Sequence, residues 1–283
     1  MHRVLGLVLA AVCLAGASAA GAQTIAFKNV AARVVIIPEA RSDVQVLFLK
    51  TNPHVPLKVV KLFNDTTQVQ PANWTGWFWG PHMSCGDREG QPSATVPGLG
   101  EIAYDDLPQI TVRVPMDAKV VAGGAIYGSA GRSQKLNLVI AGCGDWTVAN
   151  VQDQLWVEFA GAGKLHTGSA GNMSLRIAGA ATVTTTDVTN GLTLSIAGVG
   201  NVRVHNVSGP LAVHLAGGGD VRIDNGRATT MAVHIAGSGN VDYGGVADSL
   251  DANIAGSGEI RAAKVLGAVN KFIAGSGSVD VGQ

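Results

Sequence analysis

The stretch "IAGSGNV", residues 235–241, places two glycines and a serine between an isoleucine and a valine, where neither a helix nor a regular strand is favoured. Close copies begin at residues 196, 254 and 273. With the first glycine of each Ala-Gly pair as origin, successive copies are 18 to 20 residues apart, which predicts a repeat architecture. The origins are Gly142, Gly161, Gly179, Gly198, Gly217, Gly237, Gly256 and Gly275, and a degenerate copy places Gly123 a further 19 residues back.

Three positions of the repeat are apolar in every copy. They lie six residues before, two residues before and four residues after the origin, and around Gly237 they are Met231, Ile235 and Val241. The alternate positions between them are polar or small, as at His234. A local period of two indicates strands with one face turned inward.

A single 19-residue unit cannot bury its own apolar face, but stacked units share a continuous core. The sequence therefore predicts an all-β, right-handed parallel β-helix, or solenoid, of about 8–9 coils with an N-terminal β cap. In this fold the heptapeptide is a corner, at which Ile235 and Val241 point inward while the glycines turn the chain and allow stacked backbones to approach closely.

The N-terminal quarter of the chain lacks the repeat. Residues 1–22 have the basic start, apolar run and small residues of a secretory signal peptide. Residues 23–97 are expected to form the β cap with a Trp-rich loop, continuous as one domain with the β-helix repeats of 98–283. No later stretch is long and apolar enough for a membrane span in the mature chain, so we expect an exported, soluble protein that is periplasmic or extracellular at the cell surface.

Two cysteines, Cys85 and Cys143, remain after signal removal. In an oxidising compartment they are expected to form a disulfide that joins the cap to an early coil, with two unpaired thiols as the alternative.

The charge balance limits the classes of partner that the protein can bind. Twenty Lys and Arg balance twenty Asp and Glu, so the chain has no basic excess and nucleic-acid binding is excluded.

The repeated "IAGSGxV" corners, their 19-residue spacing and the segment "FKNVAARVVIIPEARSDVQV" resemble a bacterial family named after an auto-transporter adhesin head, the GIN domain. The resemblance spans roughly residues 25–280. It implies a secreted or envelope-associated β-helix with an adhesin-like role, and it brings no catalytic residues with it.

The outward-facing positions of the repeat give little indication of a catalytic site or a metal site. A carbohydrate-active enzyme on a β-helix, the alternative function, needs clustered carboxylates, yet the outward column through Asp220, Asn240 and Glu259 has no two of them on adjacent coils. His214 and His234 occupy equivalent positions on neighbouring coils, with His205 not far off in sequence, but nothing completes a metal site. We expect no catalytic, cofactor or metal residues.

Trp74, Trp77 and Trp79 crowd into a short segment of an aromatic-poor chain. Exposed, they would form a binding surface; buried, they would close the end of the solenoid, and both interpretations stay open. The resulting hypothesis is a non-enzymatic binding or scaffold protein of the cell envelope whose partner is an envelope protein or a glycan. The sequence does not give the oligomeric state.

Overall fold

The computed structural model describes residues 22–62, 65–73, 83–88 and 90–282. Within these ranges the chain forms β-strands and one short 3-10 helix, η1 (Tyr104–Asp106), and none of its helices could cross a membrane. The strands are β1 (Gln23–Glu39), β2 (Gln45–Lys50), β3 (Leu57–Lys61), β4 (Thr66–Pro71), β5 (Ser84–Arg88), β6 (Gln91–Val96), β7 (Gly100–Ala103), β8 (Gln109–Pro115), β9 (Asp117–Ala130), β10 (Ser133–Cys143), β11 (Trp146–Val148), β12 (Val151–Thr167), β13 (Ala170–Gly198), β14 (Asn201–Gly217), β15 (Asp220–Gly237), β16 (Asn240–Ala247), β17 (Leu250–Gly256), β18 (Glu259–Val265), β19 (Val269–Gly275) and β20 (Ser278–Val281).

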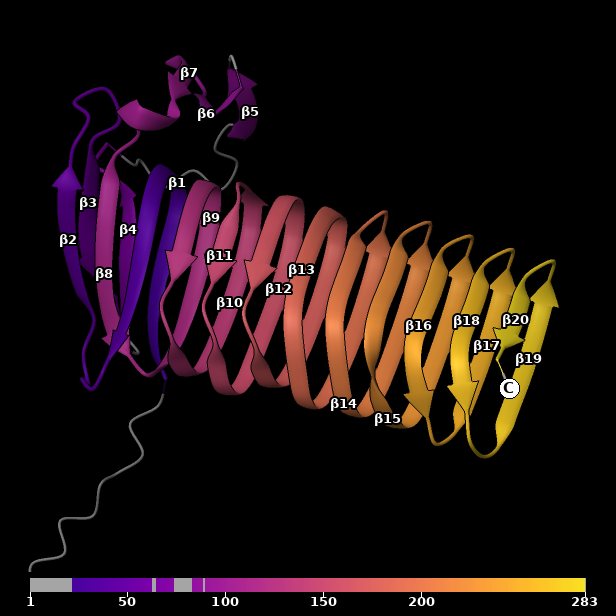
Figure 1. Cartoon of the computed structure of the whole chain (residues 1–283). Coiled ribbons are helices and arrows are strands. Elements are labelled where there is room, and N and C mark those ends of the chain that lie inside the picture. The colour runs from indigo at the N-terminus through magenta and orange to yellow at the C-terminus, as the bar shows by residue number, and fades with distance from the viewer. Residues whose placement is uncertain (1–21, 63–64, 74–82, 89, 283) are drawn as a thin grey trace, which may run out of the picture.

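The strands coil into a β-solenoid of about nine turns with a period of ~19 residues, which confirms the predicted fold class (Figure 1). Each coil pairs in parallel with the next, so that Leu194 pairs with Val213 and Val213 with Val233. Equivalent residues of the repeat therefore form columns along the rod. The right-handed sense of the coil stays a prediction.

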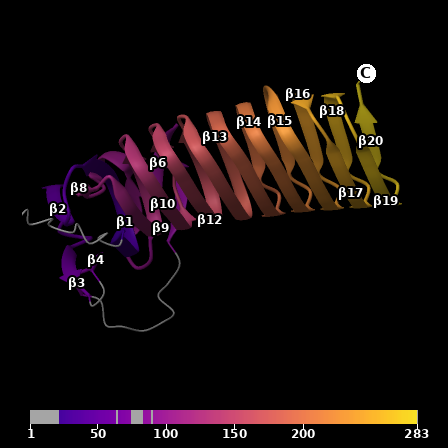
Figure 2. The ribbon, with the colours of Figure 1, turned by 90° about the horizontal axis from the view of Figure 1, so that it is seen from below.

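The order of elements along the rod departs from chain order at the N-terminal end. β1 is itself a coil, because it pairs in parallel with β9 on one side and with β4 and β8 on the other. The antiparallel strands β2 and β3 then pair with β8 and β4 and cover this end (Figure 2). The segment 23–97 thus supplies coil strands as well as covering strands, and the domain boundaries remain a proposal.

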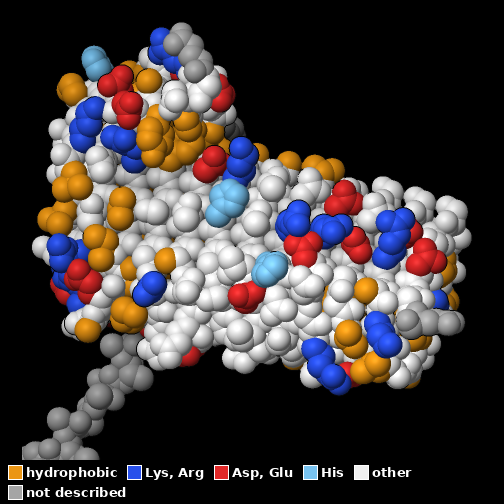
Figure 3. Space-filling model, in the orientation of Figure 1, with side chains coloured by type: hydrophobic (Ala, Val, Ile, Leu, Met, Phe, Trp, Pro, Cys, Tyr) orange, Lys and Arg blue, Asp and Glu red, His pale blue; other side chains and the backbone are white. Residues whose placement is uncertain are grey.

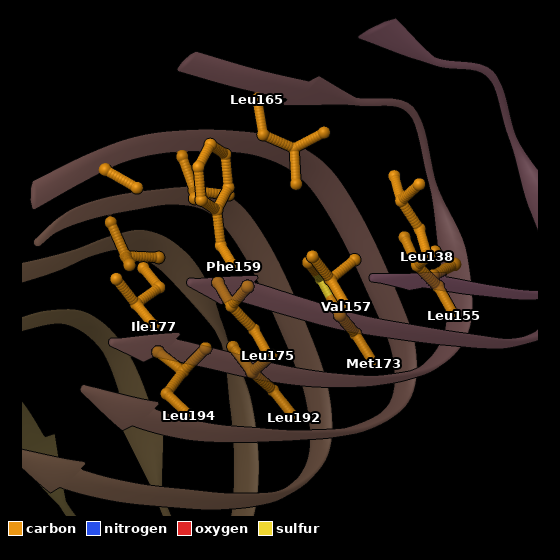
Figure 4. Packing of buried hydrophobic residues seen from close by; sticks show 14 of the residues in the cluster. Leu138, Leu155, Val157, Phe159, Leu165, Met173, Leu175, Ile177, Leu192 and Leu194 are labelled. Atoms are coloured by element: carbon orange, nitrogen blue, oxygen red, sulfur yellow. The ribbon is translucent and has the colours of Figure 1, made fainter. Parts of the chain in front are cut away.

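The predicted apolar columns form the core. Met231, Ile235 and Val241 are each at most 2% exposed. Figure 4 shows the same arrangement four coils earlier, where Leu155, Val157 and Phe159 point from one strand into the interior. The last coil of the described residues differs: there Val269 and Ile273 are 37% and 40% exposed, because these residues form no further coil that covers them.

Two further inward columns were not identified from the sequence. One lies four residues before the origin glycine, as at Val233, and the other six residues after it, as at Tyr243. The second column contains two buried threonines, Thr167 and Thr185, whose hydroxyl groups hydrogen-bond to each other. These polar side chains are tolerated in the core because their hydroxyl groups find hydrogen-bond partners in each other and in the carbonyl oxygen of Gly168.

The corner glycines are required for two different reasons. Gly237 has a φ of +137°, a backbone conformation that residues with a side chain rarely adopt. A Cβ there would lie 2.3 Å from the carbonyl oxygen of Gly217 on the preceding coil. Gly239 has no such backbone angle, but a Cβ would still meet the oxygen of Gly219 at 2.2 Å. The weak-looking heptapeptide is therefore the place where successive backbones come into contact.

We predict that Ile196→Asp strongly destabilises the protein whereas Thr193→Asp does not. Ile196 is 1% exposed in an inward column, so an aspartate there buries an unpaired charge, at a cost of about 4 kcal/mol or more. Thr193 lies exposed on the same strand and faces solvent. Thermal unfolding followed by circular dichroism measures the difference, and equal melting temperatures for the two variants would contradict the register.

Candidate binding surfaces

A small subdomain projects from the N-terminal coils. It consists of β5, β6, β7 and η1, which form a separate antiparallel sheet with a short helix, and is called here the flap (Figure 1). Its buried residues Ala94 and Val96, together with Leu107 directly after η1, pack on Ala31 and Ala125 of the coils. Hydrophobic side chains also gather at the base of the flap in Figure 3. The flap is thus attached through a second apolar core, distinct from that of the solenoid.

The predicted disulfide joins the flap to the solenoid. Cys85 of β5 and Cys143 of β10 are bonded, with their Cα atoms 5.8 Å apart. Cys143 belongs to the outward corner column that begins with Ala31 and Ala125, and later coils carry Ser238 in this position. The bond therefore lies beside the apolar contact of the flap and holds it at a fixed place on the coils.

A cleft of about 360 Å³ lies where the flap meets the outer face of the coils, and we call it the flap cleft. Outward residues of successive coils form one wall, since Arg33 pairs in register with Tyr127 and the next coil contributes Asp145. The lining comprises Arg33, Val34 and Val35 of β1, Pro92 of β6, Tyr104 of η1, Gln109 of β8, Tyr127, Gly128 and Ser129 of β9, Asp145, Trp146 and Thr147 at β11, and His166 of β12.

Aromatic and charged groups in this cleft hold one another in place. The Arg33 guanidinium lies 4.8 Å from the centre of the Tyr104 ring and pairs with Asp105 at 3.3 Å. The rings of Tyr104 and Tyr127 meet edge to face with centroids 5.4 Å apart. The Tyr127 hydroxyl donates a hydrogen bond of 2.7 Å to the carbonyl oxygen of Ser93 in the flap.

The Tyr127 hydroxyl is an uncharged group within the cleft. Burial, and then the negative charge of Asp145, raise the pKa of Tyr127 to about 12, so its hydroxyl stays protonated at any physiological pH. Asp145 accepts a 3.0 Å hydrogen bond from the backbone N–H of Lys164 and keeps a second carboxylate oxygen. Tyrosine rings beside fixed donors and acceptors of both signs suit an uncharged polar ligand better than a highly charged one.

A second hollow, of about 450 Å³, lies on another side of the solenoid surface, toward the C-terminal end. The imidazoles of His214 and His234 stack there with centroids 5.0 Å apart and planes within 6°, as expected for equivalent positions on adjacent coils. Phe272 lines the hollow at the last coil. His205 lies apart from the pair, in the column of Asp224, and the described residues contain no group of three or more potential metal ligands.

Several outward carboxylates of the later coils are paired with arginines. Asp224 receives hydrogen bonds from Arg222 at 2.9 Å and Arg203 at 3.0 Å, and Arg222 also pairs with Asp242. Partial burial of Asp224 would raise the pKa of its carboxyl, but the two arginines outweigh it and lower that pKa. This is the opposite direction from that of a general acid. Figure 3 accordingly shows charges of both signs in small mixed groups.

The column predicted to separate carboxylates does so. Asp220 pairs in register with Asn240, and Asn240 with Glu259. The other predicted surface, formed by Trp74, Trp77 and Trp79, lies outside the described residues. The flap cleft itself was missed, because its residues come from seven elements and only Asp145 and Trp146 belong to columns that the repeat reveals.

The architecture defines a β-solenoid protein with a disulfide-anchored flap. Residues 106–226 and 208–283 match the family described as "Putative auto-transporter adhesin, head GIN domain", and the chain belongs to this family. No curated protein gives a significant match.

Solved structures with some likeness include a "Putative lipid binding protein" from Parabacteroides distasonis, with 18% identity, coverage of 93% of each chain and a TM-score of 0.46. A second is a "putative adhesin" from Bacteroides fragilis, with 12% identity, coverage of 92% of this chain and 91% of the other, and a TM-score of 0.37.

We predict that Cys143→Ser loosens the flap and leaves the later coils unchanged. Serine is the residue that later coils carry in this position, so the corner should tolerate it, while loss of the bond removes a constraint of about 4 kcal/mol on the chain-entropy estimate. Hydrogen exchange measured by mass spectrometry should become faster in residues 90–106 and stay constant in residues 170–265. Reduction of the wild-type protein is the matching control. Unchanged exchange in the flap would mean that its apolar contact alone holds it.

Proposed function

We propose that the protein is an exported, non-enzymatic binding protein of the bacterial cell envelope, and that it recognises a saccharide in the flap cleft. The observation that carries the proposal is the cleft itself, in which the rings of Tyr104 and Tyr127 lie beside Arg33 and Asp145. Saccharides present both apolar C–H faces and many hydroxyl groups. Such ligands match a surface that combines aromatic rings with fixed hydrogen-bond donors and acceptors.

Rigidity of the cleft supports this role. One wall is a hydrogen-bonded ladder of coils, and the other is held by the Cys85–Cys143 bond and by the hydrogen bond from Tyr127 to Ser93. A ligand would meet a surface whose side chains are already ordered, so that little conformational entropy is lost on binding. The family's description as an adhesin head agrees with a binding role outside the cytoplasm.

Export is supported by two features. The start of the chain has the pattern of a signal peptide, over residues 1–22, and disulfides persist mainly in oxidising compartments. We therefore assign the protein to the periplasm or the cell surface.

The proposal predicts that Asp145→Ala and His166→Ala each weaken saccharide binding by about tenfold or more, because each removes a hydrogen-bonding group from the mouth of the cleft. Thr184→Ala is the matched control, since Thr184 follows His166 in the same outward column one coil further along. The mature wild-type protein is first screened on a glycan array, and affinities are then measured by calorimetry. Melting temperatures of the three variants should agree closely.

Three outcomes are informative. Absence of any glycan binding by the wild-type protein, or equal binding by the Asp145→Ala and Thr184→Ala variants, would refute the saccharide cleft. Capture of an envelope protein that depends on Asp145 would keep the site and change its ligand. Release of shortened glycan, detected by mass spectrometry of the incubated ligand, would favour the alternative of a carbohydrate-active enzyme.

A further inference from the structure

In the part of the chain that the structure describes, the C-terminal coil of the solenoid is open on one side. The last turn, β19 and β20, has a neighbouring coil on one side only. Its inward apolar residues are accordingly exposed, with Val269 at 37% and Ile273 at 40%. At the other end of the rod, β2 and β3 cover the first coil with antiparallel strands, so the two ends differ.

The backbone of this last coil is directed outward for further pairing. The N–H group of Met231 donates to the carbonyl of Ser249 on the next coil at 3.0 Å, and that of Leu250 donates to Ala268 at 2.9 Å. Val269 has the same position in the last coil, so its N–H group points toward the open end. A flat edge of this kind, beside exposed apolar side chains, is a template for another strand.

One residue breaks the pattern of the core at this end. The inward column that passes through Leu194, Val213, Val233 and Ala252 continues in register to Lys271. The preceding members of the column are fully buried aliphatic residues. Lysine is thus the last residue of a hydrophobic column, in a position where the repeat calls for leucine or valine.

The lysine side chain lies across the mouth of the coil. Its ammonium group donates a 2.9 Å hydrogen bond to the carbonyl oxygen of Val279, which belongs to β20 on the opposite side. Ala252, directly beneath, is small and leaves room for the aliphatic stem of the lysine. The methylene groups therefore cover the end of the core while the charge remains at the surface.

We infer that Lys271 closes the C-terminal end of the solenoid against a second copy of this chain. The inter-coil ladder makes a second copy the matched partner, because two open ends related by a twofold axis present the same apolar columns and the same strand edge to each other. Stacking of this kind would enclose two ammonium groups in one continuous core. Desolvation and mutual repulsion of these charges oppose the association.

The test replaces Lys271 with leucine, the residue at the equivalent position of Leu194, and measures molar mass by light scattering and sedimentation over a concentration series. The wild-type protein should remain a monomer through this end, while K271L should self-associate with an affinity higher by about tenfold or more. K264L is the matched control, because Lys264 is exposed but lies outside the core columns. K271R keeps the charge and should behave as wild type.

Thermal unfolding separates association from misfolding. K271L should melt no lower than wild type, since leucine fits the column. Equal molar masses for K271L and wild type at every concentration would overturn the inference. Association of K264L as strong as that of K271L would also overturn it, because it would indicate non-specific hydrophobic association. Association of the wild-type protein, with cross-links between residues 269–273 of two copies, would show that Lys271 does not close this end.

Discussion

The whole structure depends on the in-register stacking of one backbone on the next. At each corner the carbonyl of one coil meets a glycine of the following coil so closely that no Cβ could fit, as between Gly217 and Gly237. This contact fixes the register, and the register in turn sets every column of side chains, inward and outward. The apolar core, the polar ladders and the stacked His214–His234 pair are consequences of the same repeat.

The contrast between the repeated coils and the inserted flap explains where aromatic and polar groups converge on the surface. The later coils carry short outward side chains and arginine–carboxylate pairs, such as Arg222 with Asp224 and Asp242, which neutralise one another. Among the described residues, only the N-terminal coils support a second layer, the flap, and its underside creates a cleft with converging aromatic and polar groups. The solenoid thus acts as a rigid support, and the departure from the repeat provides the cleft that we propose as the recognition surface.

The division between repeat and insertion explains which features of the fold could be predicted from the sequence. Ile235 and Val241 were placed correctly because a strand has a period of two and the repeat supplies many parallel examples. The coil formed by β1 was not, because its partners β4 and β8 come much later in the chain and share no corner motif with it. The cleft escaped for the same reason: Arg33, Tyr104 and Tyr127 meet through non-local pairing, which leaves no periodic signal.

The placement of β1 also bears on the order in which the chain folds. Most coils pair across about 19 residues, as between Leu194 and Val213, whereas the pairing of Arg33 with Gln109 spans a stretch four times longer. Loop-closure entropy makes the longer pairing less favourable by about 1.2 kcal/mol before any contact compensates for it. The repetitive coils can therefore form one after another by pairing with their neighbours in the chain. The pairing of β1 with β8 can form only after the flap segment between them has been crossed. A protein that emerges N-terminus first thus has its first strand among the last to gain all its partners.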